Sequence, residues 1–263
     1  MSVLSLKGGV GKTSITLGLA GAARARGLDT VVIDLDPQAN ATTVLDPPSV
    51  QFTAHDVLGA GKAAQLPDAL SPSSWGPGVR VLASEPALEH FNRPVDGAGR
   101  AHHLRTALGG VDNQFVLLDC PPSLAELTTN ALAASDLALV VTEPTMFALA
   151  GAQQALAVVE VVHRNFNLRL RSAGIVVNRF RSRSAEHRYR LDELIAAYRD
   201  LVLDPVVPER SAISLAQGSC LPVQRWPSPG AREVSRIFAG YLDHLLAEAM
   251  AGSAGPFTKG AQR

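Results

Sequence analysis

Short apolar runs alternate along the chain with longer stretches whose apolar residues recur at helical spacing. The short runs predict strands, and the longer stretches predict amphipathic helices. Because the runs are apolar throughout and are separated by helices, they favour a parallel sheet covered on both faces. Strands are predicted at residues 3–6, 30–34, 79–83, 115–119, 137–142 and 173–178, and helices at 12–26, 148–164, 185–198 and 232–250. The expected fold class is α/β, a mostly parallel twisted sheet with helices on both faces.

The stretch 44–100 breaks this alternation. It is rich in Pro, Gly, Ser and Ala, and only residues 79–83 within it predict a strand. We interpret the stretch as an elaboration on one edge of a single domain that spans residues 1–250. Residues 251–263 are expected to form a flexible tail.

Composition narrows the class of protein. The 263 residues are 46% hydrophobic and 18% charged, which is typical of a globular protein with a sizeable core. Two cysteines, Cys120 and Cys220, are too few for a disulfide scaffold and fit a reduced cytoplasm. The N-terminus runs straight into a glycine-rich loop without a secretory signal, and no apolar run is long enough to span a bilayer. A cytoplasmic protein with no membrane partner is expected.

The glycine-rich loop at residues 7–13 reads Lys-Gly-Gly-Val-Gly-Lys-Thr and lies between a predicted strand and a predicted helix. The general phosphate-loop pattern would place a glycine at position 6, where this chain has Leu6. Three glycines within four positions still let backbone N–H groups surround an anion, and the following helix directs its positive N-terminus at that anion. Lys12 would reach the β- and γ-phosphates and the Thr13 hydroxyl would bind Mg²⁺. The loop therefore predicts binding of ATP with Mg²⁺.

Carboxylates follow two of the predicted strands. Residues 34–42 read Asp-Leu-Asp-Pro-Gln-Ala-Asn-Ala-Thr, and Asp119 ends the run Phe-Val-Leu-Leu-Asp. Because ligands of α/β proteins bind at the carboxyl ends of the strands, Asp34, Asp36 and Asp119 are expected near the phosphate loop. A structural role at the strand end is as plausible for Asp34 as a catalytic one. Cys120 is interpreted as a small buried residue.

Together these motifs resemble the deviant Walker A group of P-loop NTPases, the ParA/MinD family, which includes the ParA/Soj-type partitioning ATPases of chromosomes and plasmids. The resemblance implies slow ATP hydrolysis and a homodimer that sandwiches ATP, in which Lys7 crosses to the nucleotide of the partner. The alternative is that Lys7 adds positive potential within its own chain. The resemblance assigns catalysis to Lys7, Lys12 and Asp36, and Mg²⁺ to Thr13, Asp36 and Asp119. It assigns nucleotide contacts to Lys7, Gly8, Gly9, Val10, Gly11, Lys12, Thr13 and Ser14.

The same resemblance places the residues that bind the adenine base in the later part of the chain. Asn178 follows the strand 173–178, and Pro208 and Glu209 lie in the segment Pro-Val-Val-Pro-Glu-Arg. By resemblance, Asn178 and the backbone of Pro208 and Glu209 contact the base, although Asn178 could equally cap a strand end. This region departs from the family pattern at Glu209, at Gln217 near a usual acidic position, and at Cys220 near a usual glycine.

The net charge of zero conceals an asymmetry. Residues 1–160 contain 9 Lys/Arg and 15 Asp/Glu, a balance of −6, whereas residues 161–263 contain 15 and 9, a balance of +6. ParA proteins bind double-stranded DNA without sequence preference through basic residues of this later region. The resemblance therefore implies a DNA surface, nucleoid association and a ParB-like or other adaptor protein as a further partner. The expected DNA-binding residues are Arg179, Arg181, Arg183, Arg210, Arg225 and Arg232.

Three alternatives remain open for this basic region. It could be a solvated arginine-rich face whose charges pair with acids. It could serve a positioning ATPase that tracks the nucleoid but carries a protein cargo. A MinD-like membrane switch would need a basic amphipathic helix at the C-terminus, which Gly252, Gly255 and Pro256 disfavour.

Overall fold

A seven-stranded sheet forms the centre of the protein. The computed structural model describes residues 1–60, 66–92, 100–109, 111 and 115–252. The strands follow the order β3-β4-β2-β5-β1-β6-β7, and all neighbours are parallel except β3 and β4. They are β1 (Ser2–Leu4), β2 (Thr30–Asp34), β3 (Ser71–Pro72), β4 (Val79–Leu82), β5 (Phe115–Asp119), β6 (Leu137–Thr142) and β7 (Arg171–Val177).

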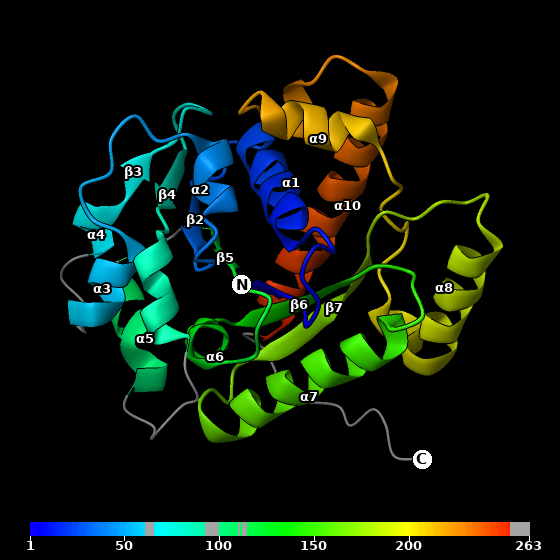
Figure 1. Cartoon of the computed structure of the whole chain (residues 1–263), viewed down its shortest axis with the longest axis horizontal. Coiled ribbons are helices and arrows are strands. Elements are labelled where there is room, and N and C mark those ends of the chain that lie inside the picture. Colours follow the sequence, from blue (N-terminus) through cyan, green and yellow to red (C-terminus); the bar gives the residue numbers. More distant parts are fainter. Residues whose placement is uncertain (61–65, 93–99, 110, 112–114, 253–263) are drawn as a thin grey trace.

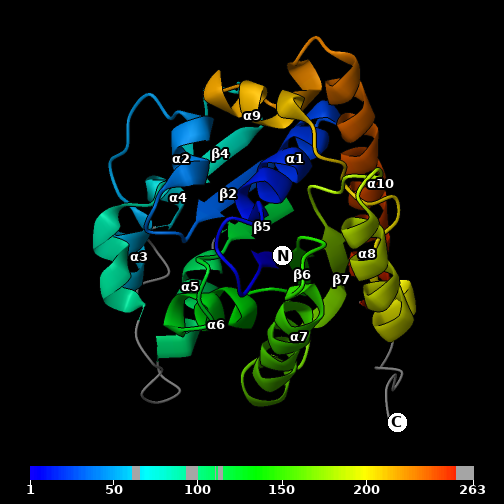
Figure 2. The same cartoon turned by 45° about the vertical axis from the view of Figure 1, so that its right-hand side comes forward.

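Helices cover both faces of this sheet, with α1 and α10 together on one side and α6 and α7 on the other (Figure 1). Figure 2 shows α8 at the periphery, where it contacts α7. The α-helices are α1 (Lys12–Ala25), α2 (Asn40–Leu45), α3 (Ala54–Ala60), α4 (Leu66–Ala69), α5 (His103–Leu108), α6 (Glu126–Ala133), α7 (Ala148–Asn165), α8 (Ala185–Tyr198), α9 (Ser211–Gly218) and α10 (Pro229–Gly252). Short 3₁₀ turns are η2 (Pro86–Phe91), η3 (Arg100–His102), η4 (Arg199–Leu201) and η5 (Val223–Arg225).

The strands alternate their side chains between two hydrophobic cores. Val3 and Val32 face the core formed with α1 and α10, whereas Leu4 and Ile33 face the core formed with α6 and α7. This alternation is the two-residue period of a strand buried on both faces. It explains why the strand sequences are apolar throughout.

The predicted fold class is confirmed, and several elements have the predicted bounds. The strands at 30–34, 115–119 and 137–142 and the helix at 185–198 start and end as expected. The strand predicted at 3–6 is wrong at its end, because the Ser5 hydroxyl bonds both the N–H and the carbonyl of Lys7 and turns the chain after Leu4. The last helix begins earlier than predicted, at Pro229, since proline is favoured in a first helical turn.

The elaboration predicted at 44–100 contains more structure than the sequence indicated. It supplies β3, β4, α3, α4 and η2, with β3 and β4 at one edge of the sheet. The expected tail at 251–263 needs correction at its start, because α10 continues through Gly252, and residues 253–263 lie outside the described residues. The division into one domain stays a prediction. Among the described residues, no helix is both long and apolar enough to cross a bilayer.

Candidate nucleotide site

Three strands bring the predicted chemistry to one edge of the sheet. The phosphate loop follows β1, Asp34 ends β2, and Asp119 ends β5. In the parallel register Asp34 lies opposite Asp119, and Asp119 also lies opposite Val3 of β1. The carboxyl ends of the strands therefore place both carboxylates beside the loop, as expected for an α/β ligand site.

The phosphate loop has the backbone of an anion cradle. Gly9 and Gly11 have left-handed φ angles of 83° and 87°, which side chains other than glycine adopt only with strain. Within the part of the chain that the structure describes, the backbone N–H groups of residues 8–14 donate to no acceptor, and no side chain caps α1. Unsatisfied N–H groups at a helix N-terminus form a binding site for an anion such as a phosphate.

The two lysines of the loop have opposite environments. Lys12, the first residue of α1, is only 6% exposed and lies near Asp119, whose charge it partly offsets. Lys7 is exposed at the start of the loop. Lys12 thus faces the interior of its own site, whereas Lys7 is available to a group outside the chain.

Two hydroxyls hold the Asp119 carboxylate. Thr13 Oγ1 donates to Asp119 Oδ2 at 2.7 Å, and Thr16 Oγ1 donates to Asp119 Oδ1 at 2.8 Å. Burial raises the pKa of Asp119, and these two hydrogen bonds lower it in part. A hydroxyl oxygen beside a carboxylate supplies the hard oxygen donors that Mg²⁺ prefers, so Thr13 and Asp119 fit the predicted metal role. Burial also raises the pKa of the Cys120 thiol, to about 12, and this residue is fully buried as predicted.

Asp34 is a buried anchor. Its carboxylate accepts hydrogen bonds from the N–H of Asp36 at 3.1 Å and from both the N–H and the hydroxyl of Thr42 at 2.8 Å. Burial, followed by the charge of Asp119, raises the pKa of the Asp34 carboxyl. These contacts fix the path of residues 34–42 and favour the structural interpretation of Asp34.

Asp36 is held by a residue that sequence reasoning missed. Ser84 follows β4 in the 44–100 stretch, and its Oγ donates to the Asp36 carbonyl at 2.7 Å. The Ser84 N–H in turn donates to the Thr42 hydroxyl at 2.9 Å. Asp36 is only 7% exposed, and its carboxylate accepts a hydrogen bond from the Gln38 N–H at 3.0 Å. Nothing in the spacing of Ser84 along the chain marks this contact, because it depends on β4 pairing beside β2.

At the predicted base end, Asn178 contacts the phosphate loop directly. Its side chain is buried, and Nδ2 donates to the Val10 carbonyl at 2.8 Å. A Cβ atom at Gly11 would lie 2.3 Å from the same Nδ2, so any side chain at position 11 would clash with the Asn178 side chain. Pro208 and Glu209 run beside Phe180, and the Glu209 N–H donates to the Phe180 carbonyl at 3.0 Å. That N–H is therefore engaged within the protein.

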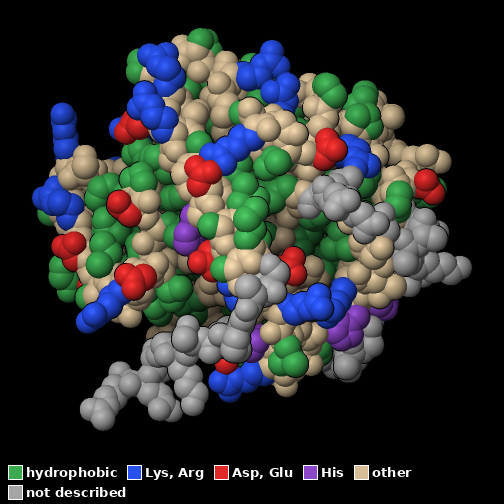
Figure 3. Space-filling model, turned by 180° about the vertical axis from the view of Figure 1, so that it is seen from behind, with side chains coloured by type: hydrophobic (Ala, Val, Ile, Leu, Met, Phe, Trp, Pro, Cys, Tyr) green, Lys and Arg blue, Asp and Glu red, His purple; other side chains and the backbone are tan. Residues whose placement is uncertain are grey.

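The predicted DNA-binding arginines divide into two groups. Arg179 pairs with Glu143, Arg181 with Glu209 and Arg210 with Glu233. Across the described ranges, Arg183, Arg225 and Arg232 are exposed and form no ion pair. On the face shown in Figure 3, positive and negative side chains are interspersed, with no broad surface of one sign.

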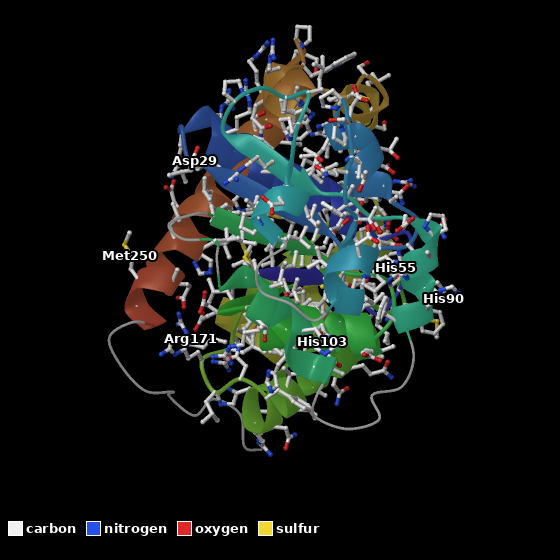
Figure 4. All side chains as sticks on the ribbon, turned by 90° about the vertical axis from the view of Figure 1, so that its left-hand side faces the viewer. Asp29, His55, His90, His103, Arg171 and Met250 are labelled. Atoms are coloured by element: carbon white, nitrogen blue, oxygen red, sulfur yellow. The ribbon has the colours of Figure 1, made fainter. Side chains whose placement is uncertain are left out.

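Two histidines of the 44–100 stretch lie close together. His55 of α3 and His90 of η2 lie on the side of the molecule shown in Figure 4, with ring centroids 6.3 Å apart. Within the described part of the chain, no group of three or more His, Cys, Asp or Glu side chains is arranged to hold a metal ion.

The strand order, the two-lysine loop and the aligned carboxylates define a P-loop ATPase. A family model described as an AAA domain matches residues 1–172. The chromosome partitioning protein ParA of Caulobacter vibrioides is 33% identical over 230 residues, which cover 85% of each chain. The chromosome-partitioning ATPase Soj of Thermus thermophilus is 32% identical over 239 residues, which cover 90% of this chain and 92% of Soj. The chain belongs to the ParA/Soj family of partitioning ATPases.

Solved structures share the fold. The structure of cobyrinic acid a,c-diamide synthase from Mycobacterium smegmatis with bound ADP and magnesium is 28% identical, with a TM-score of 0.76, and the match covers 98% of both chains. An ATP complex of a McdA variant from Cyanothece is 18% identical with a TM-score of 0.80, covering 93% of this chain and 95% of McdA, and shows the fold alone. The nucleotide and magnesium in the first structure agree with the predicted cofactors, ATP and Mg²⁺.

Proposed function

We propose that this ATPase is an ATP-driven DNA-partitioning switch. In this proposal two chains sandwich ATP, the dimer binds double-stranded DNA without sequence preference, and a ParB-type partner stimulates slow hydrolysis. The observation that carries the proposal is the contrast between buried Lys12 and exposed Lys7 within one phosphate loop. Lys12 serves the nucleotide of its own chain, whereas Lys7 extends to the nucleotide of the partner chain.

Each part of the nucleotide has candidate residues. The N–H groups of residues 8–14 and Lys12 bind the phosphates, Thr13, Asp36 and Asp119 hold Mg²⁺, and Asn178 with the 208–209 backbone contacts the base. Bound Mg²⁺ would offset the charge of the phosphates during their transfer. Asp36 orients the attacking water, because phosphoryl transfer depends chiefly on positioning.

DNA binding is assigned to the arginines around 179–183 and in the later region. Across the described residues, Arg183, Arg225 and Arg232 are exposed and form no ion pair, and in this proposal each of the other three exchanges its glutamate partner for a DNA phosphate. The Arg181–Glu209 and Arg210–Glu233 pairs are exposed on both sides, and exposed ion pairs contribute only about 0–1 kcal/mol, so these two arginines can change partners at little cost. The Glu143 side chain is only 15% exposed, so release of Arg179 costs more because a largely buried carboxylate is left unpaired. Dimerisation doubles the basic surface and strengthens DNA binding through bivalency, which makes DNA affinity depend on ATP. The protein is proposed to lie in the cytoplasm on the nucleoid.

The first experiment measures dimerisation and DNA binding with ATP, ADP or no nucleotide over a salt series. Binding is expected only with ATP and should weaken steeply as salt rises. Lys12→Ala should lose nucleotide, while Lys7→Ala should retain nucleotide but fail to dimerise. Equal DNA binding in all three nucleotide states would reject the switch. A Lys7→Ala protein that dimerises like the parent would reject its role across the interface.

The second experiment identifies the cargo. Asp36→Ala should bind ATP and Mg²⁺ but hydrolyse ATP far more slowly, which traps the dimer. Partners recovered with the trapped dimer and absent with Lys12→Ala distinguish a DNA-bound ParB-type adaptor from an adaptor on a protein body. Hydrolysis by Asp36→Ala at the parent rate would contradict the assignment of Asp36.

A further inference from the structure

Helix α9 reaches the phosphate loop through one side chain. Gln217, near the end of α9, donates from Nε2 to the Ser14 hydroxyl at 3.1 Å, and the Ser14 hydroxyl donates to Gln217 Oε1 over a longer distance of 3.5 Å. Ser14 is the third residue of α1, within the turn whose N–H groups face the anion site. The contact joins residues separated by 203 positions, so it depends entirely on the packing of α9.

The placement of Ser14 ties this contact to one part of the nucleotide site. A Cβ atom at Gly11 would lie 3.8 Å from the Ser14 Cβ and 2.3 Å from Asn178 Nδ2. Ser14 and Asn178 therefore both border Gly11, and Thr13 beside Ser14 points to Asp119 instead. Ser14 thus lies between the Mg²⁺ side and the base side of the site, where the phosphate closest to the sugar would bind.

The hydrogen-bond direction determines what the Ser14 hydroxyl can do. A serine hydroxyl has one proton to donate and two lone pairs that accept. The Gln217 amide donates to one lone pair at 3.1 Å and holds the hydroxyl proton only through the longer 3.5 Å contact with Oε1, so a phosphate oxygen can take that proton in its place. A carboxylate at position 217 would instead accept that proton and would add a negative charge near the phosphates.

Helix α9 holds Gln217 firmly enough for this role. Ala212 and Ala216 are buried against the core that contains α1 and α10. The neighbouring segment is fixed by Gln224, whose Nε2 donates to the Gly18 carbonyl of α1 at 2.9 Å. Two amide side chains thus connect the region after residue 210 to the helix that follows the phosphate loop.

We infer that Gln217 is a positioning residue for nucleotide binding, which orients the Ser14 hydroxyl toward the phosphate closest to the sugar. The inference rests on the proposed phosphate site and adds to it a residue that acts through Ser14. It also makes α9 a part of the ATP site. A movement of α9 that displaces Gln217 would change the direction in which the Ser14 hydroxyl donates.

The test compares four variants of the full chain by ATP and ADP affinity with Mg²⁺, and by ATPase rate where ATP saturates. Gln217→Met keeps the length of the side chain but removes the donor, and should weaken both nucleotides about three- to tenfold. Gln217→Glu should weaken them further. Its affinity should recover as pH falls toward the pKa of the new carboxyl, because the protonated acid can donate again. The parent should lack this pH dependence.

Two further variants separate positioning from structural damage. Ser214→Glu places the same charge on an exposed position of α9 and should bind nucleotide like the parent. In a Ser14→Ala background, Gln217→Met should have little further effect, since both changes remove one interaction. Melting temperatures of the nucleotide-free variants should match that of the parent.

The outcomes keep this inference separate from the proposed function. Parent-like affinity in both Gln217 variants overturns the role of Gln217, as does a full Gln217→Met effect in the Ser14→Ala background. If Ser14→Ala alone binds like the parent, the path through Ser14 is wrong even though the phosphate loop stands. A parent protein that fails to bind ATP would instead reject the proposed function itself.

Discussion

The Ser84 hydroxyl donates a 2.7 Å hydrogen bond to the backbone carbonyl of Asp36. Ser84 follows β4, the second strand from the edge of the sheet, whereas Asp36 lies in the acidic segment after β2. The contact links the elaborated edge of the sheet to the residue proposed to position the attacking water. It gives part of the 44–100 stretch a role in the site.

Ser84→Ala should slow ATP hydrolysis several-fold while leaving ATP affinity nearly unchanged. Loss of one buried hydrogen bond, worth about 1 kcal/mol, loosens Asp36 without removing any group that binds phosphate. Steady-state hydrolysis and nucleotide titration measure the two effects. Ser74→Ala is the matched control, because the Ser74 hydroxyl bonds the Leu45 carbonyl away from the site. An equal loss of rate in both variants would indicate general damage to this edge.

The buried carboxyls of Asp34 and Asp119 should make the protein less stable as pH rises, when nucleotide and Mg²⁺ are absent. Their pKa values are raised from 3.8 to about 7 and about 6. A carboxyl whose pKa is higher in the folded state binds more protons there. Its stabilising contribution is therefore full below pH 4 and is lost as pH rises through 6 and 7.

Asp119→Asn provides the reference for this pH dependence. The free energy of unfolding of the parent relative to Asp119→Asn should fall between about pH 4 and pH 6, the window between the unfolded and the folded pKa of Asp119. The expected fall is on the order of 3 kcal/mol, at ~1.4 kcal/mol per pKa unit. Urea unfolding at each pH measures it. A constant difference between the two proteins would show that Asp119 has an ordinary pKa.

The parts of the site that are continuous in sequence could be predicted from sequence. The loop at 7–13 and the runs that end in Asp34 and Asp119 are local patterns, and parallel pairing brings strand ends to one edge without further information. Contacts such as Ser84 with Asp36 and Gln217 with Ser14 could not be predicted, since they depend on which strands and helices become neighbours. The helices within 44–133 were also missed, because several are only four to eight residues long and show little periodicity.

The arginine pairs mark another limit of sequence reasoning. Counting charges in residues 161–263 identified a basic region but could not reveal that Glu143, Glu209 and Glu233 lie against Arg179, Arg181 and Arg210. Each glutamate comes from a different segment of the chain. Their effect on DNA binding follows only from the folded arrangement.

Cys220→Gly should stabilise the protein by about 0.5–1 kcal/mol. Cys220 has a φ of 52°, in the left-handed region, near the position where the family pattern has a glycine. A side chain there is strained by roughly 1–2 kcal/mol, which exceeds the extra entropy that glycine loses on folding. Denaturant unfolding measures the change. Cys220→Ala is the control, because it removes the sulfur contact to the Thr43 carbonyl but keeps the Cβ, and it should give no gain. Equal stabilisation by both variants would assign the effect to the thiol.

Glu209→Gln should raise the affinity of the ATP-bound protein for double-stranded DNA. Glu209 binds Arg181 with both carboxylate oxygens, and both side chains are exposed. The amide releases the guanidinium for a phosphate and removes a negative charge from the proposed DNA surface. We expect the affinity for DNA to rise about two- to fivefold at moderate salt. The slope of log affinity against log salt concentration should steepen by about 0.9 for each added phosphate contact.

The control for this change is Glu160→Gln, which alters net charge by the same amount. Glu160 pairs with Arg164 on α7, outside the set of proposed DNA-binding arginines. Titration of a fluorescent DNA duplex at several salt concentrations compares the two variants. An equal gain in both would show that DNA responds to net charge alone, and no gain in either would place the DNA surface away from Arg181. A gain confined to Glu209→Gln, and lost again in the Glu209→Gln, Arg181→Ala double variant, would assign the phosphate contact to the Arg181 guanidinium.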